Sequence, residues 1–276
     1  MKKFNIGTSA RVVFILIVLG LAVFPLYWMF TTSLTSDSNL FGKTVQPFPD
    51  LSRIGVYGDA LFAGKVPLWL FNSLMIAAGT CVLAVSLGIP LGYALSRFTF
   101  RGKAFAGVGL FLTQMLPEAL LVVPLFALFR QLDLLNSLGG LILVDTAFVL
   151  PIVAFILKGA IDGIPRELEE AARVDGCRPL SVLTRINLPL IAPTVAAAAV
   201  ISFFSGWNEY VFAVTFAADP NKQPASVGLA GFVGELSTPL QTVMAVSVIY
   251  TLPAVAFYLV AQKYVVSGMT AGAVKG

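Results

Sequence analysis

The stretch that decides the fold is Glu169-Glu-Ala-Ala-Arg-Val-Asp-Gly-Cys-Arg-Pro-Leu-Ser-Val-Leu-Thr-Arg-Ile-Asn-Leu-Pro189, a charge-rich segment between two long apolar ones. It belongs to a chain of 276 residues, of which 58% are hydrophobic and only 12% are charged, with a mean hydropathy of +0.89. This composition, together with apolar runs long enough to cross a bilayer, is typical of a membrane protein. The quoted stretch is therefore interpreted as a polar loop between two membrane spans.

Six apolar runs reach or approach the roughly 17 to 25 residues that a membrane-spanning helix needs. They are residues 12–32, 69–95, 105–129, 141–157, 190–213 and 243–261. The first run is longer than the apolar core of a signal peptide, and no clear cleavage site follows it, so we expect a retained anchor. Gly88 and Gly92 form one small-xxx-small pair, which we interpret as ordinary helix packing. The sequence thus predicts an all-α polytopic membrane protein with six transmembrane helices.

The basic residues indicate how these helices are oriented. With the N-terminus in the cytoplasm, 13 of the 18 Lys and Arg residues lie on the cytoplasmic side. Because cytoplasmic loops are enriched in basic residues, this orientation is favoured, and six crossings then place both termini in the cytoplasm. The net charge of +4 follows from this topology, and no nucleic-acid partner is expected. The expected segments are a cytoplasmic N-terminus (1–11), a first transmembrane helix (12–32), an external segment (33–68), a five-helix core (69–263) with a cytoplasmic loop (162–189), and a cytoplasmic tail (264–276).

The loop itself predicts a helix, a tight turn and a second helix. Pro165 suits the first turn of a helix, and Gly176 suits the left-handed position that ends one. Helical periodicity gives this helix an apolar face and a charged face. The apolar face is Ile164, Leu168, Ala171 and Ala172, and the charged face is Arg166, Glu169, Glu170 and Arg173. Arg166 with Glu170, and Glu169 with Arg173, are expected i,i+4 pairs.

A second short helix is expected from Pro179 until Pro189 stops it. A solvated connecting loop would account for the charges equally well. The paired alanines favour a docking helix, because small side chains let another backbone approach closely.

The spacing within this loop resembles a known signature. Glu170-Ala171-Ala172, three residues, Gly176, nine residues, Ile186, one residue and Leu188-Pro189 match every fixed position of the EAA motif. This motif marks the membrane subunits of binding-protein-dependent ABC importers. The resemblance extends along nearly the whole chain and is strongest to MalG-type permeases of maltose and related sugar importers. Gly206-Trp-Asn-Glu-Tyr210 and the ending Gln262-Lys-Tyr-Val-Val-Ser-Gly-Met-Thr-Ala-Gly-Ala-Val-Lys-Gly276 are similar to that branch.

The resemblance implies a type I ABC importer permease fold in a bacterial or archaeal cell (inner) membrane. It also implies that the loop is a coupling helix seated in a cleft of the cytoplasmic ATPase subunit, with Glu170 reaching a basic group there. The residues expected to dock on the ATPase are Glu170, Ala171, Ala172, Gly176, Ile186, Leu188 and Pro189. The tail from Ser267 to Gly276 would also reach the ATPase dimer. The other implied partners are a second, MalF-like permease subunit, an extracytoplasmic sugar-binding protein and membrane lipid.

The residues also indicate that the chain is a non-catalytic permease subunit. Gly42-Lys43-Thr44 resembles the end of a phosphate-binding loop, but Asp37 occupies the position where that loop needs its first glycine. The chain has no histidine and only two cysteines, Cys81 and Cys177, which excludes common zinc patterns, histidine catalysis and a disulfide framework. We therefore expect no cofactor on this chain, with ATP and magnesium bound by the partner ATPase.

Three acidic residues, Glu118, Asp145 and Glu209, lie within or at the edge of the spans. Charges at membrane depth are costly and usually mark a functional site. Straight helices would place Glu118 about 20 Å and Glu209 about 28 Å into their spans. The candidate substrate pathway consists of Glu118, Asp145, Trp207, Asn208, Glu209 and Tyr210. In it the polar groups would bond sugar hydroxyls, and Trp207 or Tyr210 would stack on a pyranose face. Proton relay and helix–helix hydrogen bonding are alternatives for the carboxylates.

The expected cargo is a maltose-like oligosaccharide or a related carbohydrate. The same importer class could carry another polar cargo, such as glycerol phosphate. A phosphate would favour buried Arg or Lys, which the spans contain almost only near their ends. An ion-coupled secondary transporter is the alternative from another class. Such carriers often show inverted repeats, and no convincing repeat between the two halves is evident here.

Overall fold

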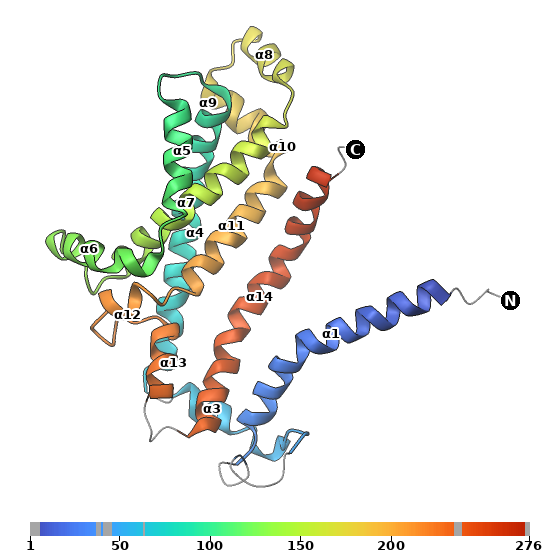
Figure 1. The fold of residues 1–276 in the computed structure, drawn as a ribbon, viewed down its shortest axis with the longest axis vertical. Coiled ribbons are helices and arrows are strands. Elements are labelled where there is room, and N and C mark those ends of the chain that lie inside the picture. Colours follow the sequence, from blue (N-terminus) through green and yellow to red (C-terminus); the bar gives the residue numbers. More distant parts are fainter. Residues whose placement is uncertain (1–5, 37–39, 41–45, 63, 235–238, 274–276) are drawn as a thin grey trace. The chain divides into compact units, whose positions relative to one another are not determined.

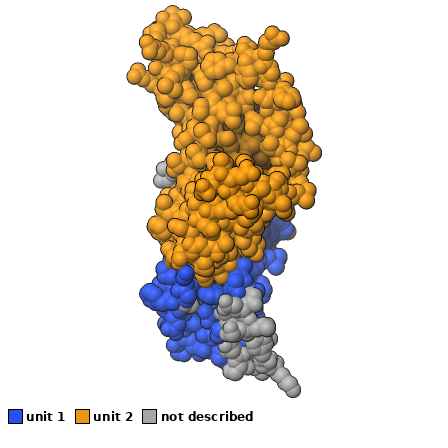
Figure 2. All heavy atoms as spheres, turned by 90° about the vertical axis from the view of Figure 1, so that its left-hand side faces the viewer, with its two compact units in different colours: residues 1–67, 229–252 blue, residues 68–228, 253–276 orange. Residues whose placement is uncertain are grey.

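The computed structural model of the chain describes residues 6–36, 40, 46–62, 64–234 and 239–273, with side chains described between residues 11 and 262. Within these ranges every regular element is helical and no strand occurs. The chain divides into two compact units, which Figure 2 shows in different colours. The first unit contains residues 1–67 and 229–252, and the second contains residues 68–228 and 253–276.

The first unit is built on one long apolar helix. Its elements are α1 (Ile6–Ser33), η1 (Leu51–Arg53), α3 (Val56–Leu61) and the first part of α14 (Leu240–Ala273). No part of the apolar stretch of α1 is buried within the chain, as expected for a helix that faces lipid. The end of α1 holds α3 through a hydrogen bond of 2.6 Å between the hydroxyls of Ser33 and Tyr57. Burial raises the pKa of the Tyr57 hydroxyl.

The second unit contains most of the remaining helices, drawn in Figure 1. They are α4 (Val66–Arg97), α5 (Lys103–Thr113), α6 (Glu118–Gln131), α7 (Leu138–Asp162), α8 (Arg166–Val174), α9 (Pro179–Val182), η2 (Leu183–Asn187), α10 (Leu188–Leu190), α11 (Ala192–Trp207), α12 (Ala213–Phe216) and the start of α13 (Ala225–Gly234). The η2 stretch is a π-helical segment that joins α9 to α10.

Four of the predicted spans are single helices. Among the described residues, α1, α4, α7 and α14 are long and apolar enough to cross a membrane. Two further spans are formed if each of two bent helix pairs counts as one: α5 with α6, bent by 103°, and Pro179–Leu190 with α11, bent by 84°. The predicted six crossings agree with the count that includes both bent pairs, and the straight helices predicted for the third and fifth runs are wrong.

The third run is broken between α5 and α6, so the straight helix used to place Glu118 is wrong. Pro117 has an extended backbone with ψ of 125° and ends the break directly before Glu118. Proline has no N–H to donate to the helical ladder, and it disfavours helical geometry in the residue before it. Glu118 consequently begins a new helix instead of lying on the side of a continuous one.

The fifth run also departs from the prediction. Its main helix begins at Ala192 and ends at Trp207, so residues 208–212 form a connection to the short helix α12. Pro189 does not stop the preceding helix as expected, because it occupies the first turn of α10, where a missing N–H costs nothing.

The core of the second unit lies where α4, α7 and α11 pack together. Gly92 of α4 is so close to α7 that a Cβ atom there would lie 3.0 Å from the carbonyl oxygen of Ala154 and 3.0 Å from the amide of Lys158. Gly206 of α11 similarly approaches α4, with a built Cβ only 2.9 Å from the Cα of Ala77. The interpretation of the Gly88 and Gly92 pair as helix packing within the chain is confirmed.

Candidate functional site

The loop of residues 162–189 has the predicted helix–turn–helix form. Its first helix, α8, ends where Gly176 adopts the left-handed conformation, with φ of +85°. The amide of Gly176 donates to the carbonyl of Arg173 at 3.0 Å, and that of Cys177 donates to Ala172 at 2.9 Å. These bonds satisfy the carbonyl groups at the helix end, and only glycine adopts this backbone without strain.

The predicted faces of α8 are wrong in part. Leu168 is 48% exposed and Ala171 is exposed, whereas Glu169, assigned to the solvent face, is only 2% exposed. Ala172 and Ile164 are buried as predicted. The reason is tertiary, because the side of α8 that faces the rest of the unit meets a cation from α4 and not an apolar surface.

That cation is Arg97, the last residue of α4. Its Nε donates to Oε1 of Glu169 at 2.6 Å, and its Nη2 donates to the carbonyl of Ile164 at 2.8 Å. Asn187 of η2 donates through Nδ2 to the same Glu169 oxygen at 3.1 Å. We call Arg97, Glu169 and Asn187 the Glu169 node. It joins three separate segments of the chain through one buried carboxylate.

Arg173 adds a second, more exposed cation beside the node. Its Nη2 lies 3.6 Å from Oε2 of Glu169, which confirms this predicted i,i+4 pair. The other predicted pair, between Arg166 and Glu170, is not formed among the residues that the structure describes. A small crevice of about 60 Å³ runs along this side of α8, lined by Arg97, Arg166, Glu169, Glu170 and Arg173.

The predicted docking residues fall into an exposed group and an interior group. Glu170, Ala171, Gly176 and Pro189 are exposed, Ile186 and Leu188 are half-buried, and Ala172 is buried. Val174, which the sequence did not single out, is 88% exposed at the end of α8. The exposed edge of α8 therefore presents Glu170, Ala171 and Val174 side by side, and none of the described residues covers them.

A second site is a cavity of about 420 Å³ within the second unit. Its lining residues are Glu118, Asp145, Phe148, Phe204, Ser205, Asn208, Glu209, Tyr210, Val211 and Phe212. They come from α6, α7, α11 and the connection between α11 and α12. The cavity thus collects five of the six residues that were predicted for the substrate pathway, from three distant parts of the sequence.

The sixth residue, Trp207, is not part of the lining. It is 2% exposed and lies in the packed interior, where its ring stacks on Phe203 with centroids 5.9 Å apart. The idea that Trp207 stacks on a sugar is not supported by this placement. Sequence reasoning instead missed the rings of Phe148, Phe204 and Phe212, which look like ordinary apolar span residues when no neighbours are known.

The carboxylate of Asp145 has an unusual setting. Asp145 is 3% exposed, and its Oδ2 has no hydrogen-bond partner among the described residues. The nearest charges are repulsive, from Glu209 first and Glu118 second. Only the hydroxyl of Thr80 favours its charged form. A buried carboxylate with no cation beside it costs free energy, so Asp145 is a candidate functional residue.

Glu209 has a structural task as well as a place in the cavity. Its Oε1 accepts from the amides of Phe212 at 2.6 Å and Ala213 at 3.0 Å, so it caps the first turn of α12. The carbonyl of Glu209 accepts from the hydroxyl of Ser226. These bonds hold the connection between α11 and α12 in one conformation at the cavity wall.

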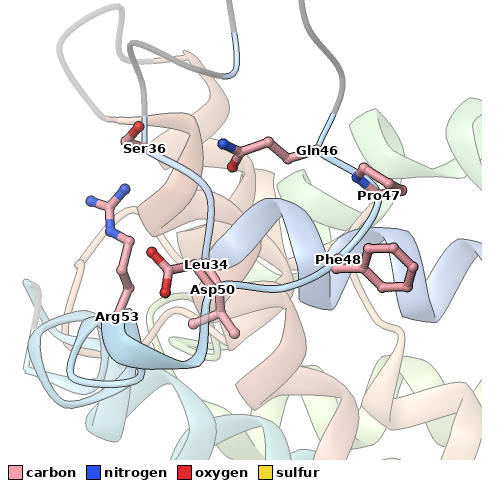
Figure 3. Close-up of a pocket in the computed structure, with 7 residues that line it drawn as sticks. All are labelled: Leu34, Ser36, Gln46, Pro47, Phe48, Asp50 and Arg53. Atoms are coloured by element: carbon pink, nitrogen blue, oxygen red, sulfur yellow. The ribbon is translucent and has the colours of Figure 1, made fainter.

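A third pocket, of about 400 Å³, lies in the first unit and is shown in Figure 3. Its lining residues are Leu34, Ser36, Gln46, Pro47, Phe48, Asp50 and Arg53. All of these lie in the segment predicted to be external, residues 33–68. The hydroxyl of Ser52 donates to Asp50 at 2.7 Å and, with the Ser52 amide, lowers the pKa of that carboxyl.

Two predicted features lie at or beyond the limits of the described residues. Residues 267–273 of the tail continue helix α14, and residues 274–276 lie outside the described ranges. The Gly42-Lys43-Thr44 segment and Asp37 also lie outside them. Among the residues described, no set of three or more carboxylate or cysteine side chains is arranged to hold a metal ion.

Comparison with known proteins identifies the family. The model of the binding-protein-dependent transport system inner membrane component matches residues 84–271. The sulfoquinovosyl glycerol transport system permease protein SmoH of Agrobacterium fabrum is 33% identical over 100% of this chain and 97% of its own length. The trehalose/maltose transport system permease protein MalG of Thermococcus litoralis is 34% identical over 93% of this chain and 92% of its own.

Solved structures agree on the fold. A bacterial ABC transporter involved in the import of the acidic polysaccharide alginate superposes with a TM-score of 0.80. It covers 96% of this chain and 98% of its own, at 24% sequence identity. The inward-facing MetNI methionine ABC transporter gives a TM-score of 0.57 at 17% identity, over 79% and 99% of the two chains. The chain belongs to the family of binding-protein-dependent transport system inner membrane components, and it is a multi-pass permease of the ABC importer fold.

Proposed function

We propose that the chain is the translocation subunit of an ATP-driven sugar importer, in which α8 transmits closure of the ATPase subunits to the membrane helices. The observation that carries this proposal is the division of α8 into an exposed edge and a buried anchor. Glu170, Ala171 and Val174 are open to a partner, while Glu169 fixes the same helix to the rest of the unit.

The bonds of Glu169 allow α8 to transmit movement to the rest of the unit. The Arg97 guanidinium bonds both the Glu169 carboxylate and the backbone of Ile164, so the end of α4 is tied to both sides of the turn that precedes α8. Asn187 extends the same connection to the segment that leads into α11. A force on the exposed edge would therefore reach two membrane helices through short, buried and charge-assisted bonds.

The other components follow from the family and remain part of the proposal. ATP and magnesium would be bound by a cytoplasmic ATPase dimer, and this chain would catalyse no reaction itself. A second, MalF-like permease would complete the pathway. A sugar-loaded binding protein would meet the predicted external segment, where Phe48 is 78% exposed beside Asp50 and Arg53. The tail of α14 would approach the ATPase.

The proposed cargo is a sugar. Relatives of this chain are named as permeases for trehalose and maltose, for diacetylchitobiose and for sulfoquinovosyl glycerol. These names differ in the particular carbohydrate and agree in its class.

Docking is tested by co-purifying the tagged chain with its ATPase from membranes. The variants are Glu170→Lys, which reverses an exposed charge, and Gly176→Val, which forces a branched side chain onto a φ of +85°. Asp59→Lys is the matched control, since Asp59 is also exposed and lies in the predicted external segment. We expect both loop variants to co-purify with at least tenfold less ATPase than the unchanged chain, and the control to co-purify with the same amount.

The proposal would be overturned if the loop variants behaved like the unchanged chain. ATPase retention and sugar uptake indifferent to both loop variants would show that α8 is only a connector. An importer that retains its ATPase yet takes up glycerol phosphate and no sugar would keep the class and reject the cargo.

A further inference from the structure

The cavity between α6, α7 and α11 carries information about the cargo that the family does not supply. Its charged lining residues are Glu118, Asp145 and Glu209, and neither Lys nor Arg is among the described residues that line it. The three carboxylates are not arranged to hold a metal ion either. The charged part of the lining therefore offers hydrogen-bond acceptors and no cation.

Asp145 shows that this set is incomplete. Its side chain is buried, lines the cavity, and has an oxygen without a hydrogen-bond partner among the described residues. The hydroxyl of Thr80 acts on this carboxyl, yet it too is buried without a hydrogen bond of ordinary geometry. Buried polar atoms in folded proteins are nearly always bonded, so two such atoms beside a cavity leave hydrogen-bonding capacity that water or a ligand can use.

The cavity lies where two of the apolar runs lose their helical structure. Glu118 begins α6 directly after the break that follows α5, and residues 208–212 connect α11 to α12. Non-helical backbone at membrane depth is tolerated only where protein covers it or where it lines a water-filled space. Two interruptions at one cavity therefore indicate a hydrated chamber and not a packing defect.

The remaining lining residues suit a sugar. Phe148 and Phe212 lie with ring centroids 5.1 Å apart, and Tyr210 and Asn208 are exposed toward open space. Aromatic faces pack on the apolar C–H faces of pyranose rings, while carboxylates accept hydrogen bonds from the hydroxyls. A carboxylate or phosphate on the ligand would instead meet like charges, which opposes its binding.

The cavity is also large enough for a sugar. Its volume of about 420 Å³ lies within the roughly 300 to 1,000 Å³ of small-molecule sites. A neighbouring pocket of about 280 Å³ shares Glu118, Phe148 and Ser205 with it and is also lined by Thr113, Gln114 and Leu116 at the break after α5.

From these observations, and resting on the proposed function, we infer that this chain contains its own binding site for an uncharged sugar. The carboxylates of Asp145, Glu118 and Glu209 accept its hydroxyl hydrogen bonds, and the lining rings pack against it. The same acceptors exclude acidic sugars. The site selects cargo within the membrane, after delivery by the binding protein.

The test uses the complete importer in lipid nanodiscs without its binding protein. Saturation-transfer NMR measures binding of maltose and trehalose as neutral probes, digalacturonic acid as an acidic probe and chitosan dimer as a cationic probe. The variants are Asp145→Asn and Glu118→Gln, which remove charge and keep shape. Asp133→Asn is the control, because Asp133 is exposed, lies outside the cavity and has a positive φ that asparagine tolerates.

We expect saturable binding of at least one neutral disaccharide that weakens fivefold or more in Asp145→Asn and in Glu118→Gln and is unchanged in Asp133→Asn. Digalacturonic acid should bind at least tenfold more weakly than the neutral sugar, and this difference should shrink when both carboxylates are removed. Absence of neutral-sugar binding, equal binding of the acid, binding of the cationic dimer alone, or indifference to the cavity variants would each overturn the inference.

This outcome is separable from that of the proposed function. An importer that retains its ATPase and performs ATP-driven sugar uptake, but whose sugar binding ignores the cavity variants, refutes only the binding site. A chain that retains no ATPase refutes the proposed function, whatever the cavity binds.

Discussion

Glu169 and Asp145 are two buried carboxylates in the same compact unit, and their surroundings are opposite. Glu169 is 2% exposed and is bonded by Arg97 at 2.6 Å and Asn187 at 3.1 Å, with Arg173 beside it. Asp145 is 3% exposed, has an oxygen without a hydrogen-bond partner among the described residues, and is repelled by Glu209 and Glu118. Equal burial therefore says nothing about the role of a charge until its partners are known.

The difference separates architecture from function. A buried carboxylate that is fully matched by a cation and an amide fixes the geometry of the segments that supply them. A buried carboxylate left among like charges lowers the stability of the fold. Such destabilising groups cluster at functional sites, where a bound ligand can compensate the loss. In this chain the matched group anchors the cytoplasmic loop, and the unmatched group lines the cavity.

The largest expected effect comes from breaking the matched group. Arg97→Met keeps much of the side-chain packing but leaves the Glu169 carboxylate buried without its main cation. Removing one partner of a buried ion pair costs about 3 to 5 kcal/mol. We expect a clear fall in the melting temperature of the purified importer and loss of ATPase retention.

The double variant Arg97→Met with Glu169→Gln provides the control for that experiment. Because both charges are then absent, much of the stability should return, and the two changes should be strongly non-additive. Additive losses in melting temperature would show that the two residues act independently and that the node is not a unit.

A smaller loss of stability is expected from pushing apart α4 and α7, the two helices that carry Arg97 and Asp145. Gly92→Ala would place a methyl group 3.0 Å from backbone atoms of α7, which cannot rotate away as a side chain could. Overpacking of this kind costs roughly 1 to 3 kcal/mol. Gly159→Ala in α7 is the control, since nothing lies within 4 Å of its Cβ position. Equal melting temperatures for the two variants would contradict the close approach of α4 and α7.

The smallest effect should have the opposite sign. Asp145→Asn removes a charge that Glu209 and Glu118 repel and that only the Thr80 hydroxyl favours. The free energy of unfolding should therefore rise by about 1 kcal/mol, with a higher melting temperature, while sugar binding falls. Thermal melting with and without maltose measures both quantities on one sample. A destabilised Asp145→Asn importer would mean that Asp145 has a compensating partner and that the comparison with Glu169 fails.

Local features of the sequence were predicted well because they depend on neighbours in the chain. Apolar runs gave the spans, and the Gly176 turn was predicted from the need for a left-handed residue, which the φ of +85° confirms. The break after α5 was signalled by Pro117, but the size of the bend was not. Arg97 was identified only as a marker of the cytoplasmic side, since its partner Glu169 is 72 residues away.

The sequence by itself determined the membrane class, the apolar runs, the helix–turn–helix loop and the resemblance to importer permeases, because composition, periodicity and spacing are properties of short segments. The tertiary structure alone decided that Glu169 faces inward and Glu170 outward, that Trp207 is core, and that Glu118, Asp145 and Glu209 share one cavity. The physical reason is that a helix can pack with any of several faces toward the rest of the protein. Which face is buried, and whether a buried charge is matched, depends on residues brought close only by packing.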